Sequence, residues 1–361
     1  MSMIWIFAAF AVAFVSVLWL HPRMVKIARE KGITDKPNRR KLQREPIPVL
    51  GGVAVFFGIV TGVGCTLNFT DSEGFVIILA LLTLMLYTGT MDDIIGLTPR
   101  FRFFIEFLAA MAAILIWGYS INDFHGLWGV NALSEWVGIP LTVIAIIGII
   151  NAINLIDGVD GLSSGYCIMA CFVFGCYFLL SGDVMMSILA TACIGALIPF
   201  FLHNVFGKRS KMFIGDGGTL LMGMIMSLFV LRVLYNGSEF VLPECADCKF
   251  GLVPFTLAVL AIPVFDTVRV MTTRIIRHTS PFSPDKKHLH HAFIELGFSH
   301  FATTMSILCL NLLIVAGWFG LYKCGCSTDI QFWFVVVTGL LFTAGIYFAA
   351  QAKTNKSAKV E

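Results

Sequence analysis

Charge is what this sequence has least of. Asp, Glu, Lys and Arg make up 13% of the 361 residues and hydrophobic residues 58%, with a mean hydropathy of +0.86. About a quarter of the residues of a soluble domain are charged, and a soluble protein this apolar would expose more apolar surface than water tolerates. The composition excludes an ordinary soluble protein and predicts an all-α polytopic membrane protein in the lipid bilayer. The net charge of +3 is too small to indicate a nucleic-acid partner.

The N-terminus lacks the features of a removable signal peptide. Residues 1–20 carry no basic leader region and no small-residue cleavage site, so we expect a retained first span. A spanning helix needs about 20 mostly apolar residues. On that length the sequence predicts eleven spans, forming one transmembrane domain over residues 1–361: 3–20, 48–69, 74–91, 103–121, 136–156, 162–181, 184–203, 218–235, 251–271, 302–322 and 330–350.

Lys and Arg are nearly absent from one side of the predicted bundle. Of the 25 Lys and Arg, 22 lie in segments 21–47, 92–102, 203–216, 269–300 and 351–361. Because basic loops remain in the cytoplasm, we expect the N-terminus outside and the C-terminus inside. The predicted cytoplasmic loops are 21–47, 92–102, 156–161, 203–217 and 272–301, followed by a flexible C-terminal tail at 351–361.

Histidine is missing beside the two close cysteine pairs in loops, Cys245/Cys248 and Cys324/Cys326. A structural zinc site draws its four ligands mainly from Cys and His, so these pairs support zinc poorly. They lie on the side opposite the basic loops, where an oxidising compartment would allow disulfides. Whether they are disulfides stays open, and neither possibility affects the chemistry below.

Polar residues cluster at four places, all on the predicted cytoplasmic side. The clusters are GTMDDIIGL with Asp92 and Asp93, NAINLIDGVDGL with Asn151, Asn154, Asp157 and Asp160, KMFIGDGGTLLMG with Asp216, and SPFSPDKKHLHHAFIELG with Lys286, His288, His290 and His291. Singly, each has a structural explanation as an interfacial acid, a helix cap, an interhelical hydrogen bond or a solvated histidine. Their convergence on one membrane face indicates a functional site.

The spacing in the second cluster indicates an oxygen-rich surface. Steps of three keep Asn151, Asn154 and Asp157 within one helix face about 120° wide, and Gly158 and Gly161 then break the helix and allow a close approach to a ligand. Carboxylate and amide oxygens are the ligands that Mg²⁺ prefers, together with waters or substrate phosphates.

Two acidic clusters also suit the binding of a metal ion or a phosphate. The adjacent carboxylates of Asp92 and Asp93 repel unless a cation or a proton lies between them. Asp216 precedes a Gly-rich turn and a helix N-terminus, where backbone donors also attract phosphate.

The HLHH segment favours the binding of an anion over that of a metal ion. His288 and His291 are three residues apart and could share a helix face, but no Glu or Cys in helical register completes a zinc set. Because Lys286, Lys287 and Arg277 lie nearby in sequence, the loop is more typical of an anion-binding surface. Such a surface suits a diphosphate or nucleotide that enters from the cytoplasm.

These motifs together resemble the polyprenyl-phosphate N-acetylhexosamine-1-phosphate transferases. The quoted segments carry the likeness, with the early loop DKPNRRKLQREPIPVLGG, over residues 20–300 by motif and throughout by hydropathy. Within the family the likeness is to the undecaprenyl-phosphate N-acetylglucosamine-1-phosphate transferases that begin O-antigen, common-antigen or teichoic-acid assembly. The resemblance implies an eleven-helix bundle in the bacterial inner membrane with a cytoplasmic active site.

The resemblance also implies a reaction and a set of roles. A sugar 1-phosphate would pass from a UDP-sugar to undecaprenyl phosphate, releasing UMP, with Mg²⁺ as cofactor and Mn²⁺ as an alternative. Asp216 would be the leading metal ligand and Asn154 the second. Asp92 and Asp93 would act on the lipid phosphate or the metal. The remaining acids, Asp157 and Asp160, would organise nucleotide and metal, and Asn151, Lys286, His288, His290 and His291 would bind substrate.

Two departures from relatives in the family bear on the donor. The related transferases that make peptidoglycan lipid I carry a lysine shortly after the paired aspartates, whereas this chain reads DDIIGL, and Leu289 stands where they have a third consecutive histidine. Both differences favour a simple N-acetylhexosamine donor, with UDP-N-acetylglucosamine first and another UDP-N-acetylhexosamine as the alternative. A homodimer is left open.

An ion-coupled transporter is the alternative from another class. Transporter sites lie near the bilayer midplane on interrupted helices of paired halves, whereas these acids gather at one face and no half-repeat is visible. Asp266, well inside the ninth predicted span, is the residue that favours a transporter, although it could pair with Arg269 three residues on.

Overall fold

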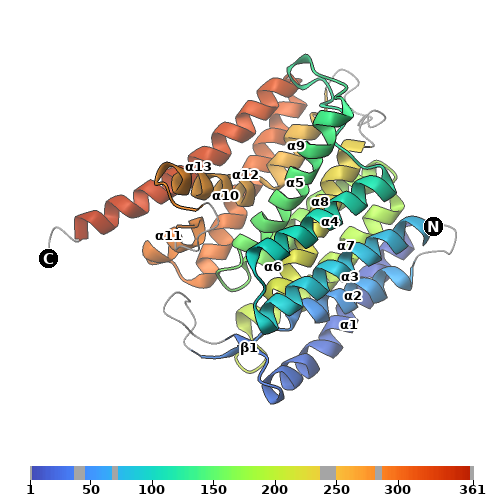
Figure 1. Cartoon of the computed structure of the whole chain (residues 1–361), viewed down its shortest axis with the longest axis vertical. Coiled ribbons are helices and arrows are strands. Elements are labelled where there is room, and N and C mark those ends of the chain that lie inside the picture. Colours follow the sequence, from blue (N-terminus) through green and yellow to red (C-terminus); the bar gives the residue numbers. More distant parts are fainter. Residues whose placement is uncertain (1, 36–44, 67–71, 236–248, 281–286, 358–361) are drawn as a thin grey trace. The chain divides into compact units, whose positions relative to one another are not determined.

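The computed structural model describes residues 2–35, 45–66, 72–235, 249–280 and 287–357 (Figure 1). The described chain is almost entirely helical, which confirms the predicted all-α class. The elements in order are α1 (Ser2–Glu30), β1 (Thr34–Asp35), β2 (Ile47–Pro48), α2 (Gly51–Gly64), α3 (Ser72–Ile95), α4 (Pro99–Trp117), the 3₁₀ turn η2 (Leu127–Gly129), α5 (Glu135–Leu155), α6 (Leu162–Leu180), α7 (Val184–Phe206), α8 (Gly215–Tyr235), α9 (Leu252–Val259), α10 (Ala261–Ile276), α11 (Leu289–Glu295), α12 (His300–Lys323) and α13 (Thr328–Ser357).

The chain divides into two compact units. Unit 1 comprises residues 1–122, 134–154 and 163–235, and unit 2 comprises residues 123–133, 155–162 and 236–361. The prediction of one transmembrane domain over residues 1–361 stays a prediction.

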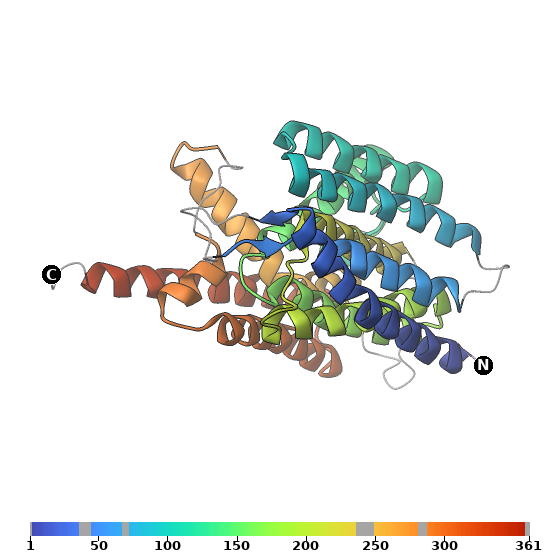
Figure 2. The ribbon, with the colours of Figure 1, turned by 90° about the horizontal axis from the view of Figure 1, so that it is seen from below.

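Unit 1 is built around α8. This helix is apolar on every side, as expected of a helix enclosed by others, and 94% of its most apolar stretch is buried. It packs against α3 and α2, while α1 packs against α7 and α2. The blue helices α1 and α2 can be followed side by side in Figures 1 and 2.

Glycines let the helices around α8 approach closely. A Cβ on Gly52 of α2 would overlap the backbone of Gly218, and a Cβ on Gly89 of α3 would overlap the backbone of Asp216. Small residues at helix contacts are the usual device for close packing in membranes, where lipid competes with apolar side chains. As a result, α2 and α3 lie directly against the first turn of α8.

Unit 2 is built from the C-terminal helices. α13 packs against α9, α10, α11 and α12, and α12 packs against α9. These helices are orange to red in Figure 1. α13 continues to Ser357, so the first part of the predicted tail at 351–361 is helical.

The apolar helices agree only in part with the eleven predicted spans. Among the described residues, eight helices are long and apolar enough to cross a membrane, or nine if α9 and α10 count as one bent span. Two predicted spans are not among them. α4 carries three charged residues, Arg100, Arg102 and Glu106, and α2 has only 14 residues, Gly51–Gly64.

The predicted span at 251–271 is two helices that meet at 78°. Pro263 lies in the first turn of α10 and has no N–H to continue the helix. The buried Asn311 of α12 satisfies the backbone groups at this break. Its Oδ1 accepts from the N–H of Ile262 at 3.0 Å, and its Nδ2 donates to the carbonyl oxygens of Ala258 and Val259 at 3.3 and 3.1 Å.

The loop cysteines are described in part. Cys324 and Cys326 are free thiols, so the disulfide considered for them is not formed. The other pair, Cys245 and Cys248, lies outside the described residues.

Candidate active site

A short turn between α3 and α4 sets the geometry of Asp92. α3 ends at Ile95, and Gly96 takes a left-handed conformation with φ of 71° while its N–H donates to the Asp92 carbonyl oxygen. The N–H of Leu97 donates to Asp92 Oδ1 at 2.7 Å. The turn reverses the chain, so Arg102 in α4 comes back to Asp92, with Nη1 3.4 Å from Oδ2.

Asp93 holds the start of α8. Its Oδ1 accepts from the N–H of Asp216 at 3.0 Å, and its Oδ2 accepts from the N–H of Gly217 at 3.1 Å. The first N–H groups of a helix have no partner within it and carry partial positive charge, so a carboxylate there stabilises the helix. A helix cap was one structural explanation for the cluster that contains Asp216, but the carboxylate that caps α8 is that of Asp93 in α3.

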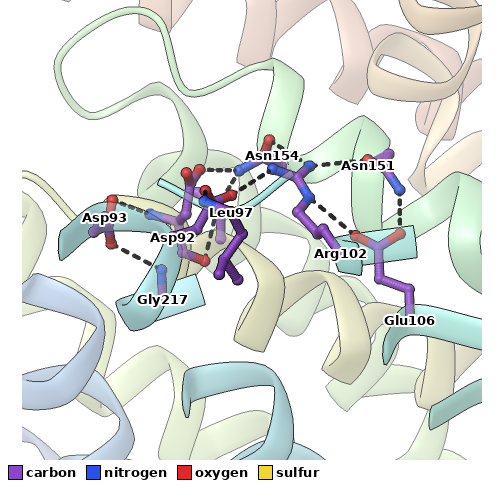
Figure 3. A network of polar contacts seen from close by, with 10 residues as sticks. Asp92, Asp93, Leu97, Arg102, Glu106, Asn151, Asn154 and Gly217 are labelled. Atoms are coloured by element: carbon purple, nitrogen blue, oxygen red, sulfur yellow. Dashed lines mark hydrogen bonds and ion pairs between the residues drawn. The ribbon is translucent and has the colours of Figure 1, made fainter. Parts of the chain in front are cut away.

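The two asparagines of α5 meet the same cluster (Figure 3). Arg102 Nη2 donates to Asn151 Oδ1 at 2.9 Å and to Asn154 Oδ1 at 3.0 Å. Asn154 Nδ2 donates to Asp216 Oδ1 at 2.6 Å and to Thr219 Oγ1 at 2.7 Å. Residues from three of the four predicted clusters therefore meet in unit 1, whereas the histidine cluster lies in unit 2.

The sequence reasoning missed Arg102 and Glu106 as residues of this cluster. Glu106 Oε1 accepts from Arg102 Nε at 3.2 Å, and Glu106 Oε2 accepts from Asn151 Nδ2 at 2.6 Å. An available signal was the Arg-x-x-x-Glu pair at the start of a span, because charges inside a membrane helix are rare and are usually paired.

These residues form the first polar network: Asp92, Asp93, Arg102, Glu106, Asn151, Asn154, Asp216 and Thr219. Within it, four carboxylates meet one guanidinium. Glu106 is fully buried, and the side chains of Asp92 and Arg102 are 15% and 17% exposed. Like charges at this density favour a cation among them.

The donor set fits Mg²⁺ in the way that Mg²⁺ is usually held. In the part of the chain that the structure describes, no three Asp, Glu, His or Cys side chains form a ready metal cage. Mg²⁺ normally takes one or two protein carboxylates and completes its shell with water and substrate phosphates. Asp216 and Asp92 supply carboxylates of that kind, whereas Asn154 Oδ1 accepts a hydrogen bond from Arg102.

Unit 2 contains a second polar network around Asp266: Asp266, Arg269, His288 and Leu289. Asp266 Oδ1 accepts from Arg269 Nη2 at 2.6 Å, and Oδ2 lies 2.9 Å from His288 Nδ1. Both oxygens also accept from the N–H of Leu289 at 3.1 Å. The expected pairing of Asp266 with Arg269 is confirmed, and Asp266 anchors the start of the HLHH helix.

His288 and His291 do not share a helix face. His288 is the extended residue before α11, which begins at Leu289. The rings of His288 and His290 are stacked, and the rings of His290 and His291 lie 4.2 Å apart between centroids. Burial lowers the pKa of His290 well below its usual range.

The glycine-rich segment after α5 packs against these histidines within unit 2. A Cβ on Gly158 would overlap the ring of His290, so glycine is required there. Asp160 Oδ2 lies 2.9 Å from His300 Nδ1, and the Asp160 carbonyl oxygen accepts from Thr304 Oγ1 at 2.9 Å. His300 was not among the predicted residues, although a histidine at the start of a span was a visible signal.

One expectation about the second cluster is wrong. α5 ends at Leu155, so Asp157 lies beyond the helix and cannot share a helix face with Asn151 and Asn154. The backbone turns at once, with the N–H of Gly158 donating to the Ile156 carbonyl oxygen at 2.8 Å. Lys286, the remaining predicted residue, lies outside the described residues.

Comparisons with known proteins identify relatives of this chain. The profile of glycosyl transferase family 4 matches residues 75–234. The probable undecaprenyl-phosphate N-acetylglucosaminyl 1-phosphate transferase of Bacillus subtilis (strain 168) is 32% identical over 316 residues, covering 86% of this chain and 82% of that protein. The undecaprenyl-phosphate alpha-N-acetylglucosaminyl 1-phosphate transferases of Yersinia pestis and Escherichia coli (strain K12) are 31% and 29% identical, covering 82% and 76% of this chain and 79% and 72% of their own lengths.

The family profile includes Asp92, Asp93, Asn151, Asn154 and Asp216, and the relatives extend the likeness over most of the remaining chain. The predicted resemblance is thereby confirmed, and the chain belongs to glycosyl transferase family 4, among the polyprenyl-phosphate N-acetylhexosamine-1-phosphate transferases.

Proposed function

We propose that this protein transfers N-acetylglucosamine 1-phosphate from UDP-N-acetylglucosamine to undecaprenyl phosphate. The products are undecaprenyl-diphospho-N-acetylglucosamine and UMP, in the first membrane step of a cell-surface polysaccharide pathway. Relatives about 30% identical over most of the chain carry the name of this activity. An alternative donor is another UDP-N-acetylhexosamine, which differs too little to leave a readable trace in these residues.

The observation that carries the proposal is the excess of carboxylates in the first polar network. The reaction joins two anions, so it needs charge neutralisation and in-line positioning more than covalent help from the protein. A simple ion pair would have one carboxylate for each guanidinium, whereas Arg102 pairs with both Asp92 and Glu106, and Asp216 and Asp93 meet at the start of α8 in the same network. This arrangement is suited to a divalent cation brought together with a diphosphate.

Asp216 is the proposed leading ligand for Mg²⁺, with Mn²⁺ as a substitute and Asp92 as a further candidate, because both carboxylates belong to the same network around Arg102. Mg²⁺, when bound, would neutralise the diphosphate oxygens at which negative charge develops. The prediction that Asn154 is a second ligand stays a prediction. As the residue lies here, its Nδ2 donates to Asp216 and orients that carboxylate.

The proposed acceptor is the phosphate of undecaprenyl phosphate, which attacks the β-phosphorus of the UDP-sugar directly and displaces UMP. Because the second pKa of a phosphate monoester is about 6, a base has only to keep the acceptor dianionic. Asp92 and Asp93 are the candidates for this task. A covalent aspartyl-phosphate route through one of them is the alternative.

The residues of unit 2 are proposed to bind the UDP-sugar. His288, His290 and His291, with Lys286, would contact its phosphates or sugar, and Asp157 and Asp160 would organise the nucleotide. The ordered stack of imidazoles and the contact of His290 with Gly158 support a prebuilt surface.

The proposed location is the bacterial inner membrane. The N-terminus would lie outside, and the C-terminus and the active site would face the cytoplasm, where UDP-sugars are made. The basic segments support this orientation, because 22 of the 25 Lys and Arg would then be cytoplasmic. A homodimer is compatible with the proposal and is not required by it.

The test is release of UMP by the purified protein in detergent, given undecaprenyl phosphate and UDP-N-acetylglucosamine, with and without Mg²⁺. Release that requires the lipid, the metal and an intact Asp216, judged by the Asp216→Ala variant, supports the proposal. Release only with another UDP-sugar changes the donor. If folded protein releases no UMP with any donor, the proposal is overturned and the transporter becomes the preferred alternative.

A further inference from the structure

Glu106 is a buried carboxylate that the proposed reaction does not use. It lies in α4 with no exposed surface, and both of its oxygens are engaged. A carboxylate enclosed among helices is unfavourable unless it is paired and hydrogen-bonded, and Arg102 and Asn151 meet that need. The question is what such a buried group does for the residues around it.

The chemistry at the ends of the network fixes the direction of every hydrogen bond in it. A guanidinium only donates and an ionised carboxylate only accepts. Asn151 lies between Glu106 and Arg102, so its amide must turn nitrogen to Glu106 and oxygen to Arg102. Asn154 lies between Arg102 and Asp216, so its amide must turn oxygen to Arg102 and nitrogen to Asp216.

Arg102 joins the two halves of this chain of hydrogen bonds. Its Nε donates to Glu106, and its Nη2 donates to both asparagine oxygens. The guanidinium is planar, so holding Nε at one edge sets where Nη2 points at the other. Glu106 therefore controls, through Arg102, the amide that faces Asp216.

We propose that Glu106 is a positioning residue for the transfer reaction: it orients Arg102, and through Arg102 the amide of Asn154 that holds the Asp216 carboxylate. This inference rests on the proposed function, in which Asp216 holds the metal. It also assigns Asn151 to the same task. Both polar ends of its side chain bond within the protein, to Glu106 and the Ile147 carbonyl oxygen on one side and to Arg102 on the other.

The test exchanges the hydrogen-bond donor and acceptor between Glu106 and Asn151. Glu106→Gln keeps the size of the side chain but places an NH₂ group against the NH₂ of Asn151, or against Arg102. Adding Asn151→Asp restores a matched pair, since the new glutamine donates to the new carboxylate and both still accept from Arg102. The double variant loses the contact with the Ile147 carbonyl oxygen, so its recovery is expected to be incomplete.

Glu106→Gln is expected to lower kcat for UMP release by about 10- to 100-fold, the effect of losing a charge-assisted hydrogen bond. KM for UDP-N-acetylglucosamine should change little, and the Mg²⁺ concentration giving half the maximal rate should rise. The double variant should recover about 10-fold over Glu106→Gln. Wild-type kcat and Mg²⁺ dependence in Glu106→Gln would overturn the proposal, as would a double variant no better than the single one.

Asp183→Asn is the matched control. Asp183 pairs with Arg232 at 2.5 Å in the same unit and is 6% exposed, but it takes no part in the first polar network. This variant should lower the unfolding midpoint while kcat and the Mg²⁺ dependence stay near the wild-type values. An equal loss of kcat in Asp183→Asn would show that any weakened ion pair slows the enzyme, and would overturn the assignment of Glu106.

Failure of the proposed function would give a different result. If wild-type protein releases no UMP with any donor, the unfolding midpoints of the two single variants and the double variant still report on the chain of hydrogen bonds. A double variant more stable than the sum of the single effects supports the orientation of Arg102 by Glu106. Additive losses overturn it.

Discussion

The two polar networks of this protein use carboxylates in opposite ways. In unit 1, Asp92 and Glu106 accept from the single arginine, Arg102, while Asp216 is joined to it through Asn154 and Asp93 lies at the start of α8 beside Asp216. In unit 2, Asp266 alone receives hydrogen bonds from Arg269 and the Leu289 N–H and lies beside His288. The first network has more negative charge than its own residues neutralise, whereas the second is balanced from within.

This difference teaches which network needs a cation and which contains a paired carboxylate. A balanced buried ion pair is a fixed part of the fold, and removing one partner leaves the other buried and unpaired. A cluster of like charges is strained until a cation arrives. Stability should therefore depend on the Asp266–Arg269 pair of the second network, and the chemical rate on the carboxylates of the first.

The largest expected effect is the loss of stability in Asp266→Asn. The substitution leaves the buried Arg269 without its carboxylate, and breaking such a pair costs about 3–5 kcal/mol. The midpoint of thermal unfolding in detergent measures it. Asp329→Asn is the control, because Asp329 accepts one N–H from Trp128 at 2.7 Å at the protein surface, and its loss should cost only about 1 kcal/mol. Equal midpoints for the two variants would remove the distinction between the networks.

Asp216→Asn is expected to lower the reaction rate without lowering the stability of the protein. Its rate of UMP release should fall by about 10²- to 10³-fold, as when a group that stabilises transition-state charge is removed. Its unfolding midpoint in EDTA should equal or exceed that of the wild type, because one of the crowded carboxylates has been neutralised. A midpoint well below the wild type would mean that the first network is structural like the second.

A smaller effect is expected where the glycine-rich segment meets the histidines. Gly158→Ala puts a methyl group into the ring of His290 and should cost about 1–3 kcal/mol of unfolding free energy through overpacking. Gly148→Ala is the control, since nothing lies near its Cβ position and alanine favours the helix by about 1 kcal/mol. Equal midpoints for the two alanine variants would show that the segment yields easily and that the histidine surface is not prebuilt.

The smallest effect is a dependence of stability on pH. The pKa of His290 is lowered in the folded protein, so the unfolded chain takes up the proton first, and the free energy of unfolding falls as the pH drops below about 6.5. The midpoint of thermal unfolding should decrease as the pH is lowered from about 7.5 to 5.5. The decrease should be less steep in His290→Gln. An identical slope in that variant would assign the pH dependence to other groups.

Several residues of the first network could be chosen from the sequence, but its completion could not. Asp92, Asp93, Asn154 and Asp216 stand out because polar groups are rare in apolar spans, and the structure brings them together. Arg102 and Glu106 look like interfacial charges in the sequence. Their part in the network depends on the turn at Gly96, which sets α4 beside α3 and brings both residues to Asn151.

The fold was predictable to a similar extent. Hydropathy identifies the long apolar helices, because the cost of placing a residue in lipid adds along the chain. It does not reveal the bend between α9 and α10, since residues 251–265 read as one apolar run across the break. The bend depends on Pro263 within the segment and on Asn311 of α12. The Asn311 side chain hydrogen-bonds to backbone groups at the break between the two helices.

The sequence by itself determined that this is a helical membrane protein, and through its motifs it indicated the sugar-phosphate transferase family to which the chain belongs. Those conclusions follow from residue types and local spacing, which are properties of the chain alone. Only the tertiary structure decided that Asp93 caps α8, that Asp157 lies beyond α5, and that Glu106 accepts a hydrogen bond from Arg102. Hydrogen bonds act over about 3 Å, so each partner is settled only when distant segments have packed together.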